Sequence, residues 1–196
     1  MEARNYEFSM VTGTEKKIYT FEEYEALERE EGIRYEYVDG EVFAMAGTTK
    51  RHNTIVQNAT FALRAVAKKK GCSVYSESVK QKLKTGEKYV YPDVIYTCEP
   101  ADLADDSETV VQSPSLLIEV VSESTQRYDI REKRLEYFKI PSLQYYLLVS
   151  QKHYCVELYE RSADFWKYTI YDGLDAKIEL EKLGVTMSLA EIYEGI

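Results

Sequence analysis

The chain has 196 residues, of which 44% are hydrophobic and 13% aromatic, enough to bury one sizeable core. Its 25 Lys and Arg residues against 34 Asp and Glu residues give a net charge of -9. This acidic balance argues against a general nucleic-acid binder, although it leaves room for a local basic patch. We expect one globular domain over residues 19–196, after an irregular lead-in over residues 1–18.

The three cysteines, Cys72, Cys98 and Cys155, are widely spaced and form no CxxC pair. Their odd number and spacing predict neither a disulfide framework nor a zinc ribbon, and fit a reducing compartment. The first residues lack an apolar signal core, and no apolar run reaches the ~18 residues that a membrane span needs. We therefore expect a cytoplasmic protein with no membrane partner.

The first third of the chain is predicted to hold two helices and a hairpin. A capping box starting at Thr20 begins the first helix, and Gly32 ends it. The dipeptide Asp39-Gly40, between two alternating runs, predicts a β-hairpin. Apolar residues at helical spacing then predict a longer helix over residues 50–70, with basic residues in its last turn.

Strands dominate the rest of the chain. Alternating or fully apolar runs predict them over residues 72–83, 88–96, 115–122, 143–150, 153–161 and 164–172. A helix is predicted from Asp129, its cap, up to Pro141, and a short helix over residues 188–196 closes the chain. This order predicts an α/β fold with a mixed sheet flanked by helices, preceded by an N-terminal helix and hairpin.

Two acidic residues stand inside apolar strands, Asp93 in "YPDVIY" and Glu119 in "LLIEVV". Burial makes a lone carboxylate costly, so each needs a partner. If the strands are neighbours, the two acids converge on one site, and oxygen-rich sites of this kind suit Mg²⁺ or Mn²⁺. The alternative is that each acid pairs with an interior Lys or Arg, as structural ion pairs also do.

The order of segments resembles a known family. "YPDVIY", the glutamate of "LLIEVV" 26 positions later, "SEST", "RYD", "REK" and "IPSLQYYLLV" are similar to the Uma-two endonuclease family of the PD-(D/E)XK nuclease superfamily, and the likeness extends from about Thr20 to the end. The resemblance implies a restriction-endonuclease-like fold that cleaves DNA. It also implies that Asp93 and Glu119 hold a divalent metal, Mg²⁺ or Mn²⁺, beside the scissile phosphate.

Two further residues match recurrent family positions. Glu36, in "YEYVDGE", resembles an acid that completes the metal shell; the alternative is a solvent-facing hairpin residue. His52, in "RHNTIVQ", resembles another recurrent residue, but a histidine at a helix start more often makes a local hydrogen bond than acts as a base. We therefore rank His52 below the acids.

The sequence departs from the superfamily pattern at the signature lysine, because position 121 is a valine. Lys133 resembles the family's compensating lysine and would supply the missing cation; the alternative is an ordinary surface lysine in a charged run. Glu123 in "SEST" adds an acid near the proposed site, where it would repel a phosphate.

A basic patch is predicted from Lys80, Lys82 and Lys84, which alternate along one strand and would share a DNA-binding face. The alternative is a solvated sheet edge that its lysines protect from aggregation.

The sequence favours a metal-dependent DNA endonuclease, with Asp93, Glu119 and Lys133 as catalytic residues. P-loop, GxGxxG, HExxH and GxSxG motifs are absent, which argues against other enzyme classes. The alternative is a catalytically inactive nuclease fold that binds nucleic acid or a protein partner, which Val121 and the acidic charge favour. The choice between a monomer and a homodimer stays open.

Overall fold

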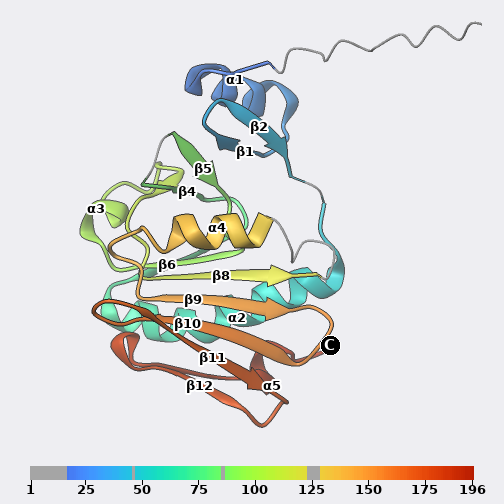
Figure 1. The fold of residues 1–196 in the computed structure, drawn as a ribbon, viewed down its shortest axis with the longest axis vertical. Helices are drawn as coiled ribbons and strands as arrows, with labels where there is room; N and C mark the ends of the chain where they lie inside the picture. Colours follow the sequence, from blue (N-terminus) through green and yellow to red (C-terminus); the bar gives the residue numbers. More distant parts are fainter. Residues whose placement is uncertain (1–16, 46, 85–86, 123–128) are drawn as a thin grey trace, which may run out of the picture.

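The structure, a computed structural model, describes residues 17–45, 47–84, 87–122 and 129–196 (Figure 1). Most of the predicted lead-in lies outside the described residues, as does Glu123. The side chain of Asp129, the predicted helix cap, is not described either.

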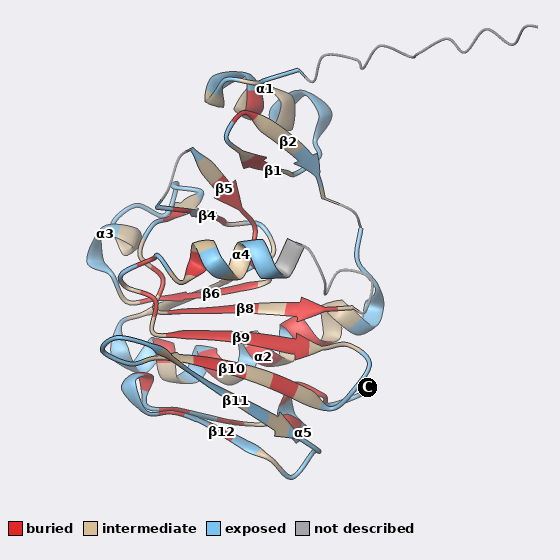
Figure 2. Cartoon of the chain, viewed as in Figure 1, coloured by how far each residue is buried: buried red, intermediate tan, exposed pale blue. Residues whose placement is uncertain are grey.

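A six-stranded sheet in the order β11-β10-β9-β8-β6-β3 forms the centre of the molecule. Its strands are β3 (Ser73–Ser76), β6 (Val94–Thr97), β8 (Leu116–Val121), β9 (Tyr145–Ser150), β10 (Cys155–Arg161) and β11 (Trp166–Asp172). β8 and β9 run parallel, whereas the other neighbours are antiparallel. β8 lies in the interior of this sheet, as its apolar residues on both faces predict, and Figure 2 shows β8 and β9 largely buried.

Helices cover both faces of this sheet. On one face α2 (Lys50–Lys70) packs through buried residues at helical spacing, joined by α5 (Leu189–Ile192) and the β12–β13 hairpin (Lys177–Leu180 and Val185–Ser188). On the other face α4 (Asp129–Tyr137) lies over β8 and β9, and Tyr137 is fully buried there. The molecule is therefore layered, with the six-stranded sheet between helices.

A second, five-stranded sheet in the order β2-β1-β5-β4-β7 carries α1 (Phe21–Glu31). Its strands are β1 (Tyr35–Val38), β2 (Glu41–Ala44), β4 (Lys80–Lys82), β5 (Lys88–Val90) and β7 (Val110–Val111). The capping box at Thr20 is confirmed, and so is the hairpin turn, where Asp39 and Gly40 both have positive φ as a type I′ turn requires. α1 packs on the sheet through a cluster of buried tyrosines.

The predicted strands 72–83 and 88–96 each divide in two, which corrects the prediction of single strands. The first breaks at Glu77, a non-glycine residue with φ 61°, and the second at Pro92, which has no N–H for the sheet ladder. After each break the chain belongs to the other sheet. The two sheets are therefore joined by two adjacent crossings, and Asp93 directly follows one of them.

Several smaller elements escaped the sequence analysis. They are α3 (Pro100–Leu103), the short helix η1 (Glu181–Leu183), β7 and the β12–β13 hairpin. α4 ends at Tyr137, before Pro141, because a turn separates the helix from the proline. The main expectation, an α/β fold with a mixed central sheet between helices and an N-terminal helix and hairpin, is confirmed.

The prediction of no disulfide is wrong, because Cys72 and Cys98 are bonded. They extend the β3–β6 pairing by one position, since Ser73 already lies opposite Thr97. Facing positions on antiparallel strands bring the two Cα atoms to 4.3 Å, close enough for the bond. Sequence spacing alone could not reveal this contact. Among the described helices, none combines the length and apolar character that crossing a bilayer requires.

Candidate active site

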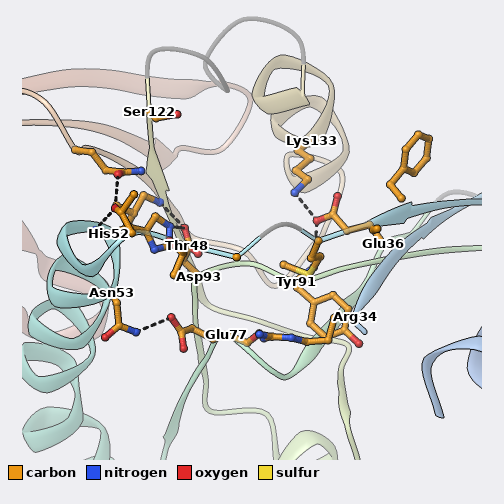
Figure 3. A pocket seen from close by; sticks show the side chains of 17 residues that line it. Arg34, Glu36, Thr48, His52, Asn53, Glu77, Tyr91, Asp93, Ser122 and Lys133 are labelled. Atoms are coloured by element: carbon orange, nitrogen blue, oxygen red, sulfur yellow. Dashed lines mark hydrogen bonds and ion pairs between the residues drawn. The ribbon is translucent and has the colours of Figure 1, made fainter. Parts of the chain in front are cut away.

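A cavity of about 570 Å³ opens where the N-terminal hairpin, the start of α2 and the end of β8 meet (Figure 3). Asp93, directly before β6, lines it together with His52 of α2, Glu36 of β1 and Lys133 of α4. The cavity lies beside the carboxyl end of β8, which runs parallel to β9. Such edges are common positions for functional sites in α/β folds.

Asp93 and Glu119 lie on neighbouring strands. Val94 is opposite Ile118, so extending the antiparallel register by one position places Asp93 opposite Glu119. The Asp93 carboxylate is held firmly, because its Oδ2 accepts hydrogen bonds from the Val120 backbone N–H at 2.6 Å and from His52 Nε2 at 3.2 Å. Two acids from separate strands are thus brought together at one place in the sheet, as the sequence analysis requires.

His52, which matches a recurrent family position, also lies in the site. Thr49 caps α2 and accepts the His52 backbone N–H, which fixes the first turn of the helix next to Asp93. Burial lowers the pKa of His52, but the hydrogen bond to Asp93 and the charges of Asp93, Glu77 and Glu119 outweigh it, so the net pKa is raised. The imidazole therefore favours the cationic form, which places a positive charge beside the Asp93 carboxylate.

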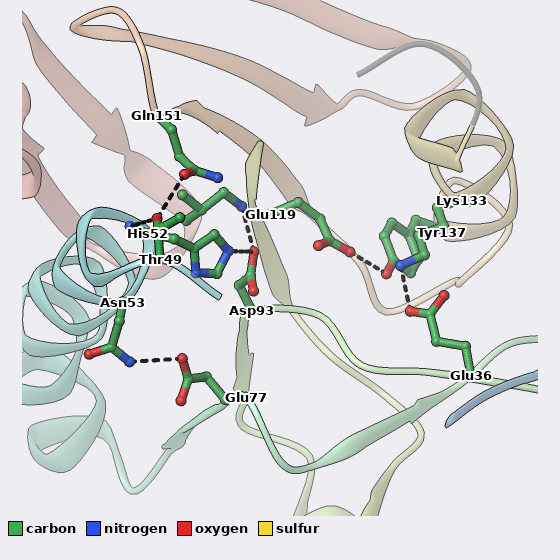
Figure 4. A network of polar contacts seen from close by, with 11 residues as sticks. Glu36, Thr49, His52, Asn53, Glu77, Asp93, Glu119, Lys133, Tyr137 and Gln151 are labelled. Carbon is green, nitrogen blue, oxygen red and sulfur yellow. Dashed lines mark hydrogen bonds and ion pairs between the residues drawn. The ribbon is translucent and has the colours of Figure 1, made fainter. Parts of the chain in front are cut away.

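Glu119 occupies a more enclosed position than Asp93. Its Oε1 accepts a hydrogen bond of 2.7 Å from Tyr137 (Figure 4). Burial raises the pKa of Glu119 to about 7; the charge of Lys133 and the Tyr137 bond act against this, while Asp93 and Glu36 add to it. The pKa of Tyr137 is itself raised well above its ordinary value by burial and by Glu119. Its hydroxyl therefore stays protonated and donates the hydrogen bond to Glu119.

Lys133 reaches the acids from α4. Its Nζ lies 2.5 Å from Glu36 Oε1, and this glutamate also accepts the Tyr91 backbone N–H at 3.4 Å. Lys133 and Tyr137 are four residues apart, so they share the helix face that points to the sheet. The structure therefore brings together Asp93, Glu119, Glu36 and Lys133 (Figure 4).

The donor set fits a metal ion held by two carboxylates. Over the described residues, no three or more His, Cys, Asp or Glu side chains are grouped so that they could hold a metal ion. Mg²⁺, however, is usually bound by one or two carboxylates and completes its shell with waters and substrate phosphates. Asp93 and Glu119 match that pattern, whereas Glu36 is engaged by Lys133.

Comparison with known proteins identifies the family of the chain. The Uma2 family model, described as "Putative restriction endonuclease", matches residues 21–190. The chain belongs to the Uma2 family. Two proteins of Synechocystis sp. (strain ATCC 27184 / PCC 6803 / Kazusa) are similar to it: slr1290 is 32% identical over 176 residues, 89% of this chain and 91% of that protein. The other, sll1609, is 33% identical over 171 residues, 87% of this chain and 96% of that protein.

A solved structure shares the fold. The crystal structure of a "putative nuclease belonging to DUF820" from Anabaena variabilis ATCC 29413 superposes with a TM-score of 0.67. The match covers 83% of this chain and 90% of that one at 15% identity. The restriction-endonuclease-like fold of this Uma2 protein is thereby confirmed, in agreement with the family description "Putative restriction endonuclease".

Lys80 does not lie where the sequence analysis placed it. Its side chain is buried, with Nζ 2.7 Å from Glu28 Oε2 and 4.6 Å from the centre of the Tyr24 ring. Lys82 and Lys84 are exposed. The expectation that all three lysines share an accessible face is therefore corrected for Lys80, because α1 covers that part of β4. DNA binding by Lys82 and Lys84 stays a prediction.

The Uma2 site contains residues that sequence reasoning overlooked. Tyr137 could have been found from its spacing of four residues after Lys133 on one helix face. Glu77 gave no such signal. Its carboxylate accepts a hydrogen bond of 3.0 Å from Asn53, and its backbone oxygen accepts one from Arg34. Glu77 thereby ties the hairpin and α2 to the crossing between the two sheets.

Proposed function

We propose that this Uma2 protein is a metal-dependent endonuclease that hydrolyses DNA phosphodiester bonds in the cavity beside Asp93. The observation that carries the proposal is the facing of Asp93 and Glu119 on neighbouring strands, with the Lys133 ammonium close by. Asp93 and Lys133 line the cavity, and Glu119 faces Asp93 from the next strand. Two acids and one cation form a set that hydrolysis of a phosphodiester can use.

Asp93 and Glu119 would hold the metal ion, Mg²⁺ or Mn²⁺, and Glu36 would add a third carboxylate through Oε2, since its Oε1 pairs with Lys133. Such an ion, when bound, supplies an activated water and charge stabilisation for the phosphate. Asp93 is suited to the role because the Val120 N–H and His52 already fix its orientation. Little reorganisation is then needed when the substrate arrives.

Glu119 carries the larger electrostatic cost. Burial raises its pKa to about 7, so the ionised form of this carboxyl is costly when no cation is present. The Tyr137 hydroxyl orients the carboxylate and satisfies one of its oxygens. A cation held by Glu119 and Asp93 would relieve the repulsion between the two carboxylates, which favours cation binding at this site.

Lys133 takes the part of the missing signature lysine. Val121, at the signature position, is buried in the core beneath α4 and carries no charge. The Lys133 ammonium reaches the same region from the helix above, where its charge lowers the pKa of Glu119. In the proposal Lys133 stabilises the charge that develops on the phosphate oxygens, and Glu36 positions it through their ion pair.

Cleavage of supercoiled plasmid tests the proposal. Wild type should nick or linearise the plasmid with Mg²⁺ or Mn²⁺ and leave it intact in EDTA. Asp93→Asn keeps the size of the side chain and should be inactive with either metal. An Asp93→Asn variant that cuts as fast as wild type would refute the assignment of the site.

A second candidate function is a nuclease fold that binds nucleic acid or a protein without cutting. The buried valine at position 121 and the pairing of Lys133 with Glu36 favour it, because both reduce the positive charge available to a phosphate. The same plasmid assay separates the two: binding of DNA without cleavage, in wild type with either metal, supports the inactive module.

A further inference from the structure

A second depression, of about 440 Å³, lies next to the cavity that contains Asp93. Its described lining consists of two cationic residues, Arg51 and Lys152, and two neutral polar residues, Ser122 and Gln151. Ser122 and Gln151 line both hollows, so the two are contiguous. One continuous surface thus leads from the acids of the proposed active site to a pair of positive charges.

The topology explains why these residues meet. β8 and β9 are parallel, so their carboxyl ends lie at one edge of the sheet, and Ser122 and Gln151 each follow one of them. The Gln151 N–H donates to the Val121 carbonyl oxygen at 2.9 Å, which fixes the two ends together. α2 begins at the same edge, where its first N–H groups give a partial positive charge.

A hydrogen bond to a neutral acceptor orients Arg51 without neutralising its positive charge. Its Nε donates to the Gln151 carbonyl oxygen at 2.5 Å, a neutral acceptor on the strand end. A guanidinium carries five N–H donors, and this bond uses one of them. Arg51 also directly precedes His52, the residue that binds Asp93, so its position is coupled to the acid through one peptide bond of α2.

We propose that this depression binds a backbone phosphate of the nucleic-acid strand, adjacent to the phosphate that is cleaved. The inference rests on the proposed function and names where the substrate strand is held. Two cations beside the neutral polar residues of the described lining, in an open hollow, match a solvated phosphate, which arginine recognises by paired N–H donors. A protein of net charge -9 needs such a local site, because its overall field repels DNA.

The subsite also sets which phosphate meets Asp93. A strand that places one phosphate between Arg51 and Lys152 presents a neighbouring phosphate to the acids, because the two hollows share a wall. Arg51 and Lys152 are therefore positioning residues that act on binding of the strand. Their loss should weaken strand binding more than it slows the cutting of strand already bound.

The site itself is tested with pyrophosphate as the probe, in EDTA so that no metal contributes. Calorimetry should show binding to wild type and at least tenfold weaker binding to the Arg51→Gln, Lys152→Gln double variant. The matched control is Arg64→Gln, Lys68→Gln, which removes an arginine and a lysine from exposed positions further along α2 and should bind as wild type does. Equal affinity of wild type and the first double variant would overturn the proposal.

The strand is tested with a labelled oligonucleotide in Ca²⁺, by the slope of log affinity against log salt. Loss of one phosphate contact should reduce the slope by about 0.7–1 in the Arg51→Gln, Lys152→Gln variant. Arg51→Lys, Lys152→Arg keeps both charges and should restore most of the slope, which a folding defect would not allow. An unchanged slope in the Gln variant would remove the strand as the occupant.

These two assays separate this inference from the proposed function. Only the subsite would be refuted if the wild type cuts DNA but the Arg51→Gln, Lys152→Gln variant has the same pyrophosphate affinity and the same salt dependence of DNA binding as the wild type. Wild type that binds pyrophosphate through these residues but neither binds nor cuts DNA would refute the nuclease function, and with it the DNA strand as the occupant.

Discussion

Glu119→Gln should make the metal-free protein more stable at alkaline pH, although it removes a proposed catalytic group. The ordinary pKa of this carboxyl is 4.5, and burial raises it to about 7 in the folded state. At ~1.4 kcal/mol for each pKa unit, full ionisation costs the fold about 3 kcal/mol, and rather less because Glu119 keeps some exposure. Glutamine has nearly the same shape and can still accept the Tyr137 hydrogen bond.

The sign of the effect follows from the raised pKa. Below pH 4.5 both states bind the proton, so the folded wild type carries no ionisation cost. As the pH rises from 4.5 through 7 the unfolded state loses the proton first, and wild-type stability falls relative to the variant. Above about pH 8 the variant should be ahead by roughly 2–3 kcal/mol, which for a chain of this size corresponds to about 5–10 °C in Tm.

Thermal unfolding in EDTA at several pH values between 4.5 and 8.5 measures this difference. The matched control is Glu132→Gln, which removes the same charge from an exposed position on α4 and should change stability by no more than about 0.5 kcal/mol. A stability difference between Glu119→Gln and wild type that stays constant across the pH range would refute the reasoning. Ionisation of Glu119 would then not be what destabilises the folded wild type.

Three further outcomes follow from the contacts. Lys133→Met should lower the single-turnover cleavage rate by about a hundredfold with little change in metal affinity, whereas Arg131→Met, exposed on the same helix, should cleave normally; similar rates for the two would exclude Lys133. Lys80→Met should cost about 3–5 kcal/mol in urea unfolding, because it leaves the Glu28 carboxylate without its opposite charge beneath α1, and a change below 1 kcal/mol would contradict this. Reduction of the Cys72–Cys98 bond, whose residues are 26 positions apart, should cost about 3 kcal/mol, and equal urea midpoints with and without reductant would argue against it.

The sequence was most informative where local physics decides the structure. Thr20 begins a helix because its side chain and that of Glu23 satisfy N–H groups at the helix start, whatever lies nearby. The Asp39-Gly40 turn follows from the few residues that tolerate positive φ. β8 could be placed in the sheet interior because its residues are apolar on both faces, which made Glu119 conspicuous.

Contacts between segments distant in the chain were harder to predict from the sequence. Residues 72–83 look like one strand because the alternation continues through Glu77, and nothing local marks the change of sheet. Lys80 is buried because α1, fifty residues earlier in the chain, supplies Glu28 as its partner. The Cys72–Cys98 bond depends in the same way on a strand register that spacing does not reveal.

The residues of the candidate site could be predicted in part. Asp93, Glu119 and Lys133 could be named from the motif order, and the structure brings them together. His52 was noticed but ranked low, because only the fold shows that the start of α2 points it at Asp93. Tyr137 was missed because a tyrosine in a helix ordinarily indicates packing. Its spacing from Lys133 indicates a shared helix face, but its bond to Glu119 also requires α4 to lie across β8.

Single-turnover cleavage of a short labelled DNA by wild type, Asp93→Asn, Glu119→Gln and the double variant tests the central claim most directly. Residues that act as one unit lose nearly all activity when either is removed, so both single variants should fall to background in Mg²⁺ and Mn²⁺, and the double variant should fall no further. Wild-type rates in either single variant, or wild-type cleavage that persists in EDTA, would contradict the claim that Asp93 and Glu119 together form a metal-dependent nuclease site.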